Sequence, residues 1–309
     1  MTRVTPELKD VQKVAVAGVN GFVGKHLVRE LVNNGIRVVG IGRELNADSD
    51  IAEIITEYIP VDLTVQWPGI GQIDAIINLA GLAAIGPSFE RPQQYISLNS
   101  AMITNMAEYY LVQPSKPRII IISSGAIYDP DQAMPLTESS AIGFSSPYAV
   151  SKVLAENQCN YYRNRGLDCI IVRPFNHIGP GQLGGFLVPD VIAQLKNGDS
   201  LTVGNITTKR DYTDVRDIVK AYRMLATVPK LNHVIYNACS GTSVSGQEIV
   251  ETLQKILGKI DVKVSVDHSK IRPTDPADIY GDATALKSDT NWSPEISLEQ
   301  TLADCVTTR

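Results

Sequence analysis

Short apolar runs alternate with longer segments of helical spacing through the first half of the chain. The runs KVAVAGV, IRVVGIG, IDAIINLAG and PRIIIISSG are rich in β-branched residues. Their near-continuous apolar character fits the strands of a parallel sheet that is covered on both faces. Alternation of strands with helices also favours right-handed crossovers, which generate a doubly wound sheet. The sequence therefore predicts an α/β fold built on a doubly wound parallel sheet.

The same patterns predict where the other elements lie. In the first half, helices are expected at residues 24–35, 51–59, 93–112 and 148–165, and further strands at 58–63 and 167–174. Beyond Pro174, helices are expected at 215–226 and 246–257, and short strands at 201–204, 233–238 and 261–266. We therefore predict a first domain over residues 1–175, to which parts of 211–240 return, and a smaller, partly interleaved α/β lobe over 176–309.

Composition narrows the class of protein. Of 309 residues, 44% are hydrophobic and 20% charged, as in ordinary soluble globular proteins. A formal charge of −5 and the absence of a basic run argue against a nucleic-acid partner. No apolar stretch approaches the ~18 residues needed to span a bilayer, and the first residues lack the apolar core of a signal peptide. We therefore expect a cytoplasmic protein that binds neither nucleic acid nor membrane.

Cysteine and histidine give little support to a metal centre. The four cysteines form no close pair, and the four histidines lie far apart in the sequence. Such cysteines are typical of buried apolar positions in a reduced protein. No metal site is therefore expected.

Three glycines stand between the first predicted strand and the first predicted helix. Gly18, Gly21 and Gly24 fall as GVNGFVG, in which Asn20, Phe22 and Val23 complete the turn. Glycines at such a turn permit a pyrophosphate to approach the helix N-terminus closely. The alternative is a merely tight turn, but the strand before and the helix after favour dinucleotide binding and a Rossmann-type sheet.

The end of the second strand decides which dinucleotide is expected. NAD-specific sites place an acidic residue there to bond the ribose 2′-hydroxyl. This chain has Gly42 at that position and Arg43 after it. Because a guanidinium attracts a 2′-phosphate, NADP(H) is favoured. NAD(H) is the alternative, in which Arg43 faces water and Glu44 contacts the ribose.

Two further strand ends are expected to contact the cofactor. Asp62, followed by Leu63, ends the third strand, where a carboxylate can bond the adenine amino group or cap a turn. Leu79, Ala80 and Gly81 close the fourth strand, at the crevice where open α/β sheets bind ligands.

Tyr148 and Lys152 stand four residues apart in SPYAVSK, on one predicted helix. Residues at this spacing share a helix face, so the ammonium can lie beside the phenol and favour its ionised form. Two serines, Ser123 and Ser124, end the apolar run RIIII upstream. Together these residues indicate a hydride-transfer site, although an ordinary surface Tyr and Lys would show the same spacing.

The set of motifs resembles the extended short-chain dehydrogenase/reductase family, which includes nucleotide-sugar epimerases, dehydratases and reductases. The resemblance spans nearly the whole chain, through GVNGFVG, NLAG, SSGAIY and YAVSK in that order. It implies that Ser124 rather than Ser123 is the catalytic hydroxyl, beside Tyr148 and Lys152. Asp129 departs from the glycine that this family usually has after the Tyr of the third motif.

The second half is similar to GDP-4-keto-6-deoxy-D-mannose reductases, through RPFNHIGPGQ, RDYTDVRDIVKAY and RPTDPADIYGD. The dehydratases of the family share related segments but carry an acidic residue within two positions after the catalytic hydroxyl. Here those positions are Gly125 and Ala126. Dehydration is therefore disfavoured, and reduction or epimerisation at C4 of a nucleotide-linked sugar remains.

The resemblance implies reduction of a nucleotide-linked 4-keto-6-deoxy sugar by NADPH, with Tyr148 as proton donor. Candidate contacts for the nucleoside-diphosphate sugar are Asn176, Arg210 and Arg272, although the two arginines could instead serve a surface pair and a loop. His177 is expected to be a structural hydrogen-bonding residue, and Asp214 a helix cap.

Two other functions stay open. A 4-epimerase would use the same three catalytic residues with tightly bound NAD, and a non-catalytic dinucleotide sensor would share the fold. The resemblance also implies a homodimer formed by the helices at 93–112 and 148–165, lined by Met102, Met106 and Tyr109. Packing of these three side chains on the sheet is the alternative.

Overall fold

A seven-stranded parallel sheet forms the centre of the computed structural model, which describes residues 11–267 and 276–307. Its strand order is β10-β6-β5-β4-β1-β2-β3, and all neighbouring strands run parallel. The strands are β1 (Lys13–Ala17), β2 (Arg37–Gly42), β3 (Glu57–Pro60), β4 (Ala75–Asn78), β5 (Arg118–Ile122), β6 (Asp168–Pro174) and β10 (Ile235–Ala238). The predicted doubly wound α/β sheet is therefore confirmed.

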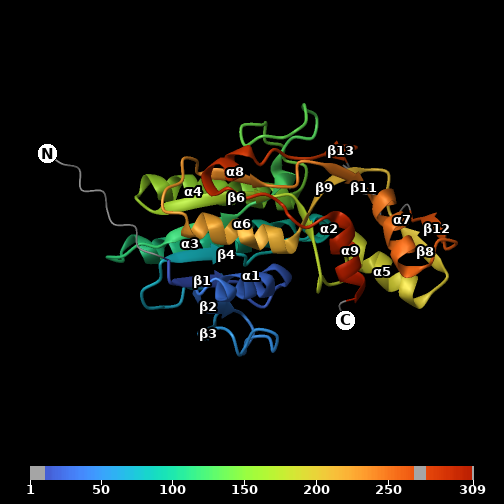
Figure 1. The fold of residues 1–309 in the computed structure, drawn as a ribbon. Coiled ribbons are helices and arrows are strands. Elements are labelled where there is room, and N and C mark those ends of the chain that lie inside the picture. The colour runs from blue at the N-terminus through green and yellow to red at the C-terminus, as the bar shows by residue number, and fades with distance from the viewer. Residues whose placement is uncertain (1–10, 268–275, 308–309) are drawn as a thin grey trace.

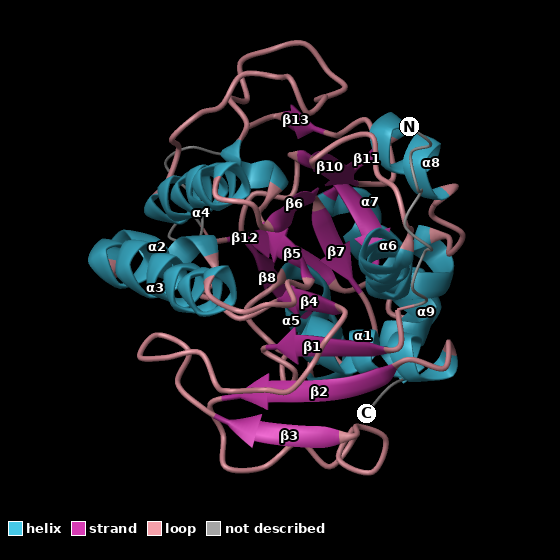
Figure 2. Ribbon diagram, turned by 90° about the vertical axis from the view of Figure 1, so that its left-hand side faces the viewer, coloured by secondary structure: helices cyan, strands magenta, loops and turns pink. Residues whose placement is uncertain are grey.

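Helices cover both faces of this sheet, as Figure 2 shows. One face carries α1 (Phe22–Asn33), α6 (Val215–Thr227) and α8 (Thr284–Thr290), and the other carries α2 (Ile85–Glu90), α3 (Pro92–Leu111) and α4 (Pro147–Asn164). A separate hydrophobic core lies under each layer. Burial of each aliphatic side chain contributes about 1.5–3 kcal/mol to the stability of the fold, so these two cores hold the sheet between its helix layers.

Met102 and Met106 lie in the core between α3 and the sheet, with exposed fractions of 8% and 1%. Tyr109 is partly buried and packs against the same cluster. Of the two alternatives for Met102 and Met106, packing on the sheet is therefore the one that the structure shows.

A smaller lobe lies beyond the carboxyl ends of the central strands, on the right of Figure 1. Its elements around one apolar cluster are α5 (Leu187–Asn197), β8 (Ser200–Val203), α7 (Gly246–Leu257), β12 (Lys263–Val266) and α9 (Leu298–Thr307). A second, small sheet joins it to the central one and contains β7 (Asn176–Ile178), β9 (Lys209–Asp214), β11 (Ser243–Ser245) and β13 (Asp278–Ile279).

The predicted helix at residues 51–59 is wrong. The backbone makes single turns there, with Ile54 and Ile55 donating to the carbonyl of Ile51, and β3 begins at Glu57. Pairing of Glu57 with Val39 of β2 extends the sheet. The backbone hydrogen bonds of a parallel edge strand thus override the helical preference that the spacing of apolar residues indicates.

Candidate active site

The loop between β1 and α1 is built so that only glycine fits at two positions. Gly18 has φ +79°, and a Cβ there would lie 2.8 Å from the Ala80 nitrogen. A Cβ on Gly24 would lie 2.5 Å from the Gly18 carbonyl oxygen. The N-cap of α1 is Gly21, which has no side chain to cap the first turn of the helix. The loop therefore presents bare backbone and a helix N-terminus, the arrangement that receives a pyrophosphate.

The end of β2 carries two residues of opposite charge. Arg43 is exposed directly after the strand. Glu44 is turned toward the glycine loop, where its carboxylate accepts a hydrogen bond of 3.2 Å from Asn20 Nδ2. The Tyr58 hydroxyl donates to the Glu44 carbonyl, which fixes this turn. Arg43, the candidate for a 2′-phosphate, and Glu44, the candidate for a ribose hydroxyl, therefore lie side by side at the end of β2. Both alternatives inferred from the sequence stay open.

Asp62 caps a turn two residues beyond β3. Its Oδ1 accepts hydrogen bonds from the Thr64 nitrogen and hydroxyl at 2.9 and 2.7 Å. These bonds, and then the charge of Arg43, lower the pKa of the Asp62 carboxyl. One carboxylate oxygen of Asp62 thus caps the turn, which is the alternative inferred from the sequence. Leu63 is buried beside it.

The NLAG segment after β4 lies against the glycine loop, as the contact between Gly18 and Ala80 shows. A side chain of α3 holds the backbone just after this segment, because Asn99 Oδ1 accepts a hydrogen bond from the Leu82 nitrogen at 2.8 Å. Gly81 has φ +151°, where other residues would be strained. Leu79 and Ala80 therefore lie directly against the glycine loop, and Gly81 follows them.

Tyr148 lies in the first turn of α4, which its own sequence starts. Ser146 is the N-cap and accepts from the Ala149 nitrogen, while Pro147 has the fixed φ that suits a first helical position. One turn on, Lys152 Nζ lies 5.7 Å from the centre of the Tyr148 ring and donates to the Ile122 carbonyl at 2.8 Å. The helix thus brings phenol and ammonium to the end of β5.

Ser124 follows β5 and begins the short helix η1 (Gly125–Ile127), accepting from the Ala126 nitrogen. Its side chain lies near enough to the Tyr148 phenol to lower the pKa of that phenol, whereas the Ser123 hydroxyl is buried without a partner in the described part of the chain. The structure therefore brings together Ser124, Tyr148 and Lys152, and it separates Ser123 from them.

The pKa of Tyr148 is raised above 10, opposite to the direction expected from the spacing with Lys152. Burial of the phenol is the largest cause, and the Ser124 side chain opposes it. Burial also lowers the pKa of Lys152 to about 8, against the charge of Glu156. The depth of burial cannot be inferred from the four-residue spacing, and its effect on the pKa of Tyr148 here outweighs that of the neighbouring ammonium.

A buried ion pair beside these residues escaped the sequence analysis. Arg173, at the end of β6, donates to both oxygens of Glu156, which lies one turn after Lys152 on α4. The available signal was the continuation of the four-residue spacing from Lys152 to Glu156. Nothing in the sequence indicated that Arg173 would face it.

The proposed substrate contacts come from the loops and strands of the smaller lobe. Asn176 is exposed at the start of β7. Arg210 Nη1 donates to the carbonyls of Lys209 and Pro276, both at 2.7 Å, so part of its guanidinium is occupied by backbone. His177 Nδ1 donates to the Phe175 carbonyl at 3.2 Å, and burial lowers the pKa of the imidazole. Arg272 lies outside the described residues.

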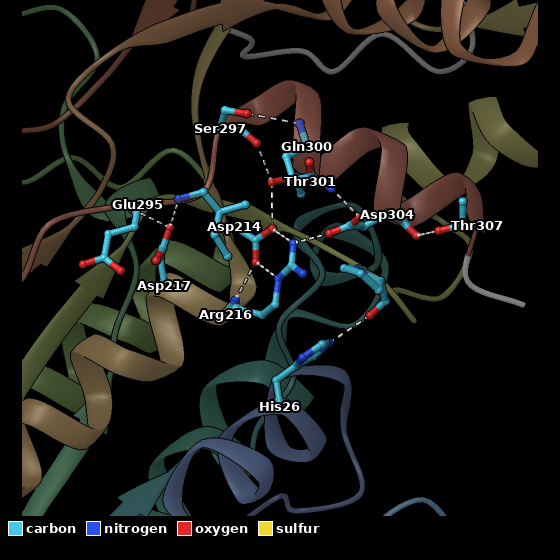
Figure 3. A network of polar contacts seen from close by, with 12 residues as sticks. His26, Asp214, Arg216, Asp217, Glu295, Ser297, Gln300, Thr301, Asp304 and Thr307 are labelled. Carbon is cyan, nitrogen blue, oxygen red and sulfur yellow. Dashed lines mark hydrogen bonds and ion pairs between the residues drawn. The ribbon is translucent and has the colours of Figure 1, made fainter. Parts of the chain in front are cut away.

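Asp214 caps α6, as predicted, and does more. Its Oδ1 accepts from the Arg216 nitrogen, its two oxygens pair with the Arg216 guanidinium, and the Thr301 hydroxyl donates to Oδ2. Arg216 also pairs with Asp304 of α9, and Figure 3 shows how this network joins α6 to the C-terminal helix. The same view shows His26 of α1 bonded to the Pro180 carbonyl.

The described residues contain neither a metal-binding cluster nor a membrane-spanning helix. Within residues 11–267 and 276–307, no group of three or more His, Cys, Asp or Glu side chains is placed to hold a metal ion. No helix in those residues is long and apolar enough to cross a membrane. The four cysteines are free, and burial raises the pKa of each thiol.

Comparison with known proteins gives consistent matches over almost the whole chain. The model of the NAD dependent epimerase/dehydratase family matches residues 14–239. The GDP-6-deoxy-D-mannose reductase of Pseudomonas aeruginosa is 30% identical over 302 residues, covering 94% of this chain and 95% of that protein. A UDP-glucose 4-epimerase of Caenorhabditis elegans is 29% identical, with the same coverage. The structure of RMD from Pseudomonas aeruginosa complexed with NADPH has a TM-score of 0.80 at 28% identity, covering 96% and 98% of the two chains.

Proposed function

The chain belongs to the NAD dependent epimerase/dehydratase family, and on this premise we propose that it reduces a 4-keto-6-deoxy sugar linked to a nucleoside diphosphate. The resemblance inferred from the sequence and the assignment as an NAD(P)-dependent enzyme of oxidoreductase type acting on a nucleotide sugar are confirmed. Within that class, we propose GDP-4-keto-6-deoxy-D-mannose as substrate and GDP-D-rhamnose as product. The similarity to a GDP-6-deoxy-D-mannose reductase supports this choice.

One observation carries the choice of reduction over dehydration. The hydroxyl of Ser124 meets the phenol of Tyr148, but the next two residues are Gly125 and Ala126, which have no group to move a proton. Gly125 packs against the Phe175 ring, where a Cβ would already lie 3.0 Å from a ring carbon. The site therefore has a proton donor for the oxygen at C4 and lacks the acid that elimination requires at these positions.

The chain's own groups supply the proton and the orientation. Bound NAD(P)H would supply the hydride. Tyr148 Oη gives its proton to the sugar oxygen as negative charge develops there, which suits a phenol whose raised pKa keeps it protonated at neutral pH. Ser124 Oγ donates a hydrogen bond to the same oxygen. Lys152, in its ammonium form, stabilises the phenolate that remains.

The glycine loop and the strand ends would hold the cofactor. The bare backbone at Gly18, Gly21 and Gly24 leaves room for the pyrophosphate, with Asn20, Phe22 and Val23 completing the turn. Asp62, Leu63 and residues 79–81 would lie along the adenosine and ribose. Asn176, Arg210 and Arg272 remain proposed contacts for the nucleotide sugar.

The substrate assignment is tested by supplying NADPH with GDP-4-keto-6-deoxymannose, and in parallel with dTDP- and UDP-linked 4-keto sugars. Turnover of the GDP-linked sugar to the 4-hydroxy product, identified by NMR, is the expected result. Consumption of a dTDP- or UDP-linked sugar in its place would refute the proposal that the substrate is linked to GDP. Absence of turnover across the panel, with NADPH bound, would favour the non-catalytic sensor.

A 4-epimerase is the second candidate function. The similarity to a UDP-glucose 4-epimerase at 29% identity favours it, as does the carboxylate of Glu44 at the end of β2. Such an enzyme keeps its dinucleotide through oxidation and re-reduction. Purified protein that carries stoichiometric NAD and interconverts two 4-hydroxy sugars without added cofactor would establish it.

For the cofactor we propose NADP(H). The support is the exposed guanidinium of Arg43 and the likeness to a reductase structure that contains NADPH. Because an arginine contact to a phosphate is typically worth about 1.5–3 kcal/mol, Arg43→Gln is expected to raise the KM for NADPH by about 10–100-fold. The KM for NADH should change little, since NADH has no 2′-phosphate.

The matched variant is Glu44→Gln, at the next position. If Glu44 contacts a ribose hydroxyl, this change weakens NADH and leaves or improves NADPH, because it removes a charge that repels the 2′-phosphate. An enzyme that prefers NADH, and whose preference Arg43→Gln does not alter, would overturn the proposal for NADP(H).

We also keep the homodimer and the cytoplasmic location as proposals. α3 and α4 lie side by side as an outer layer of the molecule (Figure 2), which is the surface that the family resemblance assigns to a four-helix interface. Light scattering on the purified protein measures the mass directly, and a monomer at micromolar concentration would refute the dimer.

A further inference from the structure

A buried ion pair lies one helical turn beyond the proposed catalytic lysine. Arg173 Nε and Nη2 donate to the two carboxylate oxygens of Glu156 at 2.9 and 2.7 Å. The two side chains are 4% and 9% exposed. A bidentate pair of this kind fixes both groups in one orientation, and its burial makes either charge costly without the other.

The same guanidinium reaches the loop that follows Ser124. Arg173 Nη1 donates to the Tyr128 hydroxyl and to the Glu138 carbonyl, both at 2.9 Å. The Tyr128 hydroxyl in turn donates to Asn237 Oδ1 at 2.6 Å. Since η1 connects Ser124 to Tyr128, one arginine joins the helix that carries Tyr148 and Lys152 to the loop that carries Ser124.

The charges around Lys152 give Glu156 a second effect. Burial lowers the pKa of Lys152 to about 8, and Glu156 is the carboxylate whose charge opposes this fall. Glu138 accepts from the Asn237 nitrogen instead. The same elements place three buried phenols and one guanidinium near this pair, namely Tyr148 on α4, Tyr95 on α3, Tyr222 on α6 and Arg173 on β6, and burial raises the pKa of each phenol. The carboxylates of Glu108 on α3 and Asp168 on β6 pair with Arg165 and Arg118 instead.

We propose that Glu156, held by Arg173, is a positioning residue for the reduction. It maintains the ammonium form of Lys152 near neutral pH, and through Arg173 it fixes the Ser124 loop against α4. This inference rests on the proposed roles of Tyr148 and Lys152. A pair that served the fold alone would affect stability without changing how activity depends on pH.

The test is the pH profile of Glu156→Gln, which keeps the shape of the side chain and removes its charge. The alkaline limb of kcat, expected near pH 8 from Lys152, should move to lower pH by about one unit. Such a shift leaves roughly tenfold less ammonium at pH of about 8.5, so kcat there should fall about tenfold. Most of the loss should be recovered at pH of about 6.5, with little change in the sugar KM.

Glu108→Gln is the matched control. Glu108 pairs with Arg165 at 2.7 Å across the outer ends of α3 and α4, and both side chains are exposed. The same chemical change at that pair should leave the pH profile as in the unaltered protein. A Glu156→Gln protein whose limb also stays in place, or whose loss is the same at every pH, would overturn the inference.

Two further measurements keep the test decisive. If Glu156→Gln does not fold, Glu156→Met combined with Arg173→Met removes both charges without leaving either unpaired, and the limb should still move down. Labelling of Lys152 by an acylating reagent, followed by mass spectrometry across pH, reports its pKa without turnover. A labelling midpoint that is unchanged by Glu156→Gln refutes the inference, whereas an inactive protein with a lowered midpoint refutes only the proposed function.

Discussion

Replacing Tyr148 by Phe is expected to lower kcat by about 10²–10⁴-fold, the usual contribution of an oriented proton donor. The ring keeps its packing against Tyr95, whose ring centre lies 6.4 Å away, so the fold should survive. Steady-state kinetics and a titration of NADPH fluorescence measure turnover and cofactor binding separately.

Tyr161→Phe is the control for this prediction. Tyr161 lies near the other end of the same helix, 55% exposed, and its hydroxyl accepts from Arg165, so its removal should leave kcat unchanged. Near-normal turnover in Tyr148→Phe, with the dinucleotide bound, would reject Tyr148 as the proton donor. Loss of dinucleotide binding in that variant would mean that the phenol holds the cofactor more than it serves the reaction.

Gly24→Ala is the second change with a large expected effect. Its new Cβ would lie 2.5 Å from the Gly18 carbonyl oxygen, and neither atom belongs to a flexible side chain. The loop or α1 must therefore shift, at a cost of about 1–3 kcal/mol typical of overpacking. A displaced loop no longer matches the pyrophosphate, so the Kd for NADPH is expected to rise about tenfold or more.

Gly86→Ala provides the comparison, because a Cβ at Gly86 meets nothing within 4 Å and the residue lies within the short helix α2. Thermal unfolding and NADPH binding should both stay close to those of the unaltered protein. If Gly24→Ala binds NADPH as well as Gly86→Ala does, the glycine loop is only a tight turn and the cofactor assignment loses its main support.

The central fold was predictable because the sequences of its strands are continuous apolar runs. Those runs specify buried strands wherever two helix layers cover a sheet, and β1, β2, β4, β5 and β6 all follow them. The edge strand β3 was harder to predict from the sequence. The apolar residues before it have helical spacing, and the strand forms because it pairs with β2. Elements of the smaller lobe, such as β7, β9 and β11, are three to six residues long and lack a periodic signal.

The site was predictable in its members and less so in its electrostatics. Ser124, Tyr148 and Lys152 meet because one helix and one strand end carry them, which short motifs can reveal. The direction of the Tyr148 pKa depends on how deeply the phenol is buried, and that is set by residues distant in sequence. Arg173 and Glu156 are 17 residues apart, on a strand and the helix before it, so their pairing could be found only in the three-dimensional structure.

The route of the chain through the two lobes limits how such a protein can be divided. After leaving the large sheet at β6, the chain builds β7, β8 and β9 elsewhere, then returns through α6 and adds β10 beside β6. A fragment ending near residue 175 would leave the border of β6 without its neighbour, open to pairing with other molecules. Exchange of whole modules between related enzymes at that point should therefore yield aggregates, and new sugar preferences are more accessible through point changes within an undivided chain.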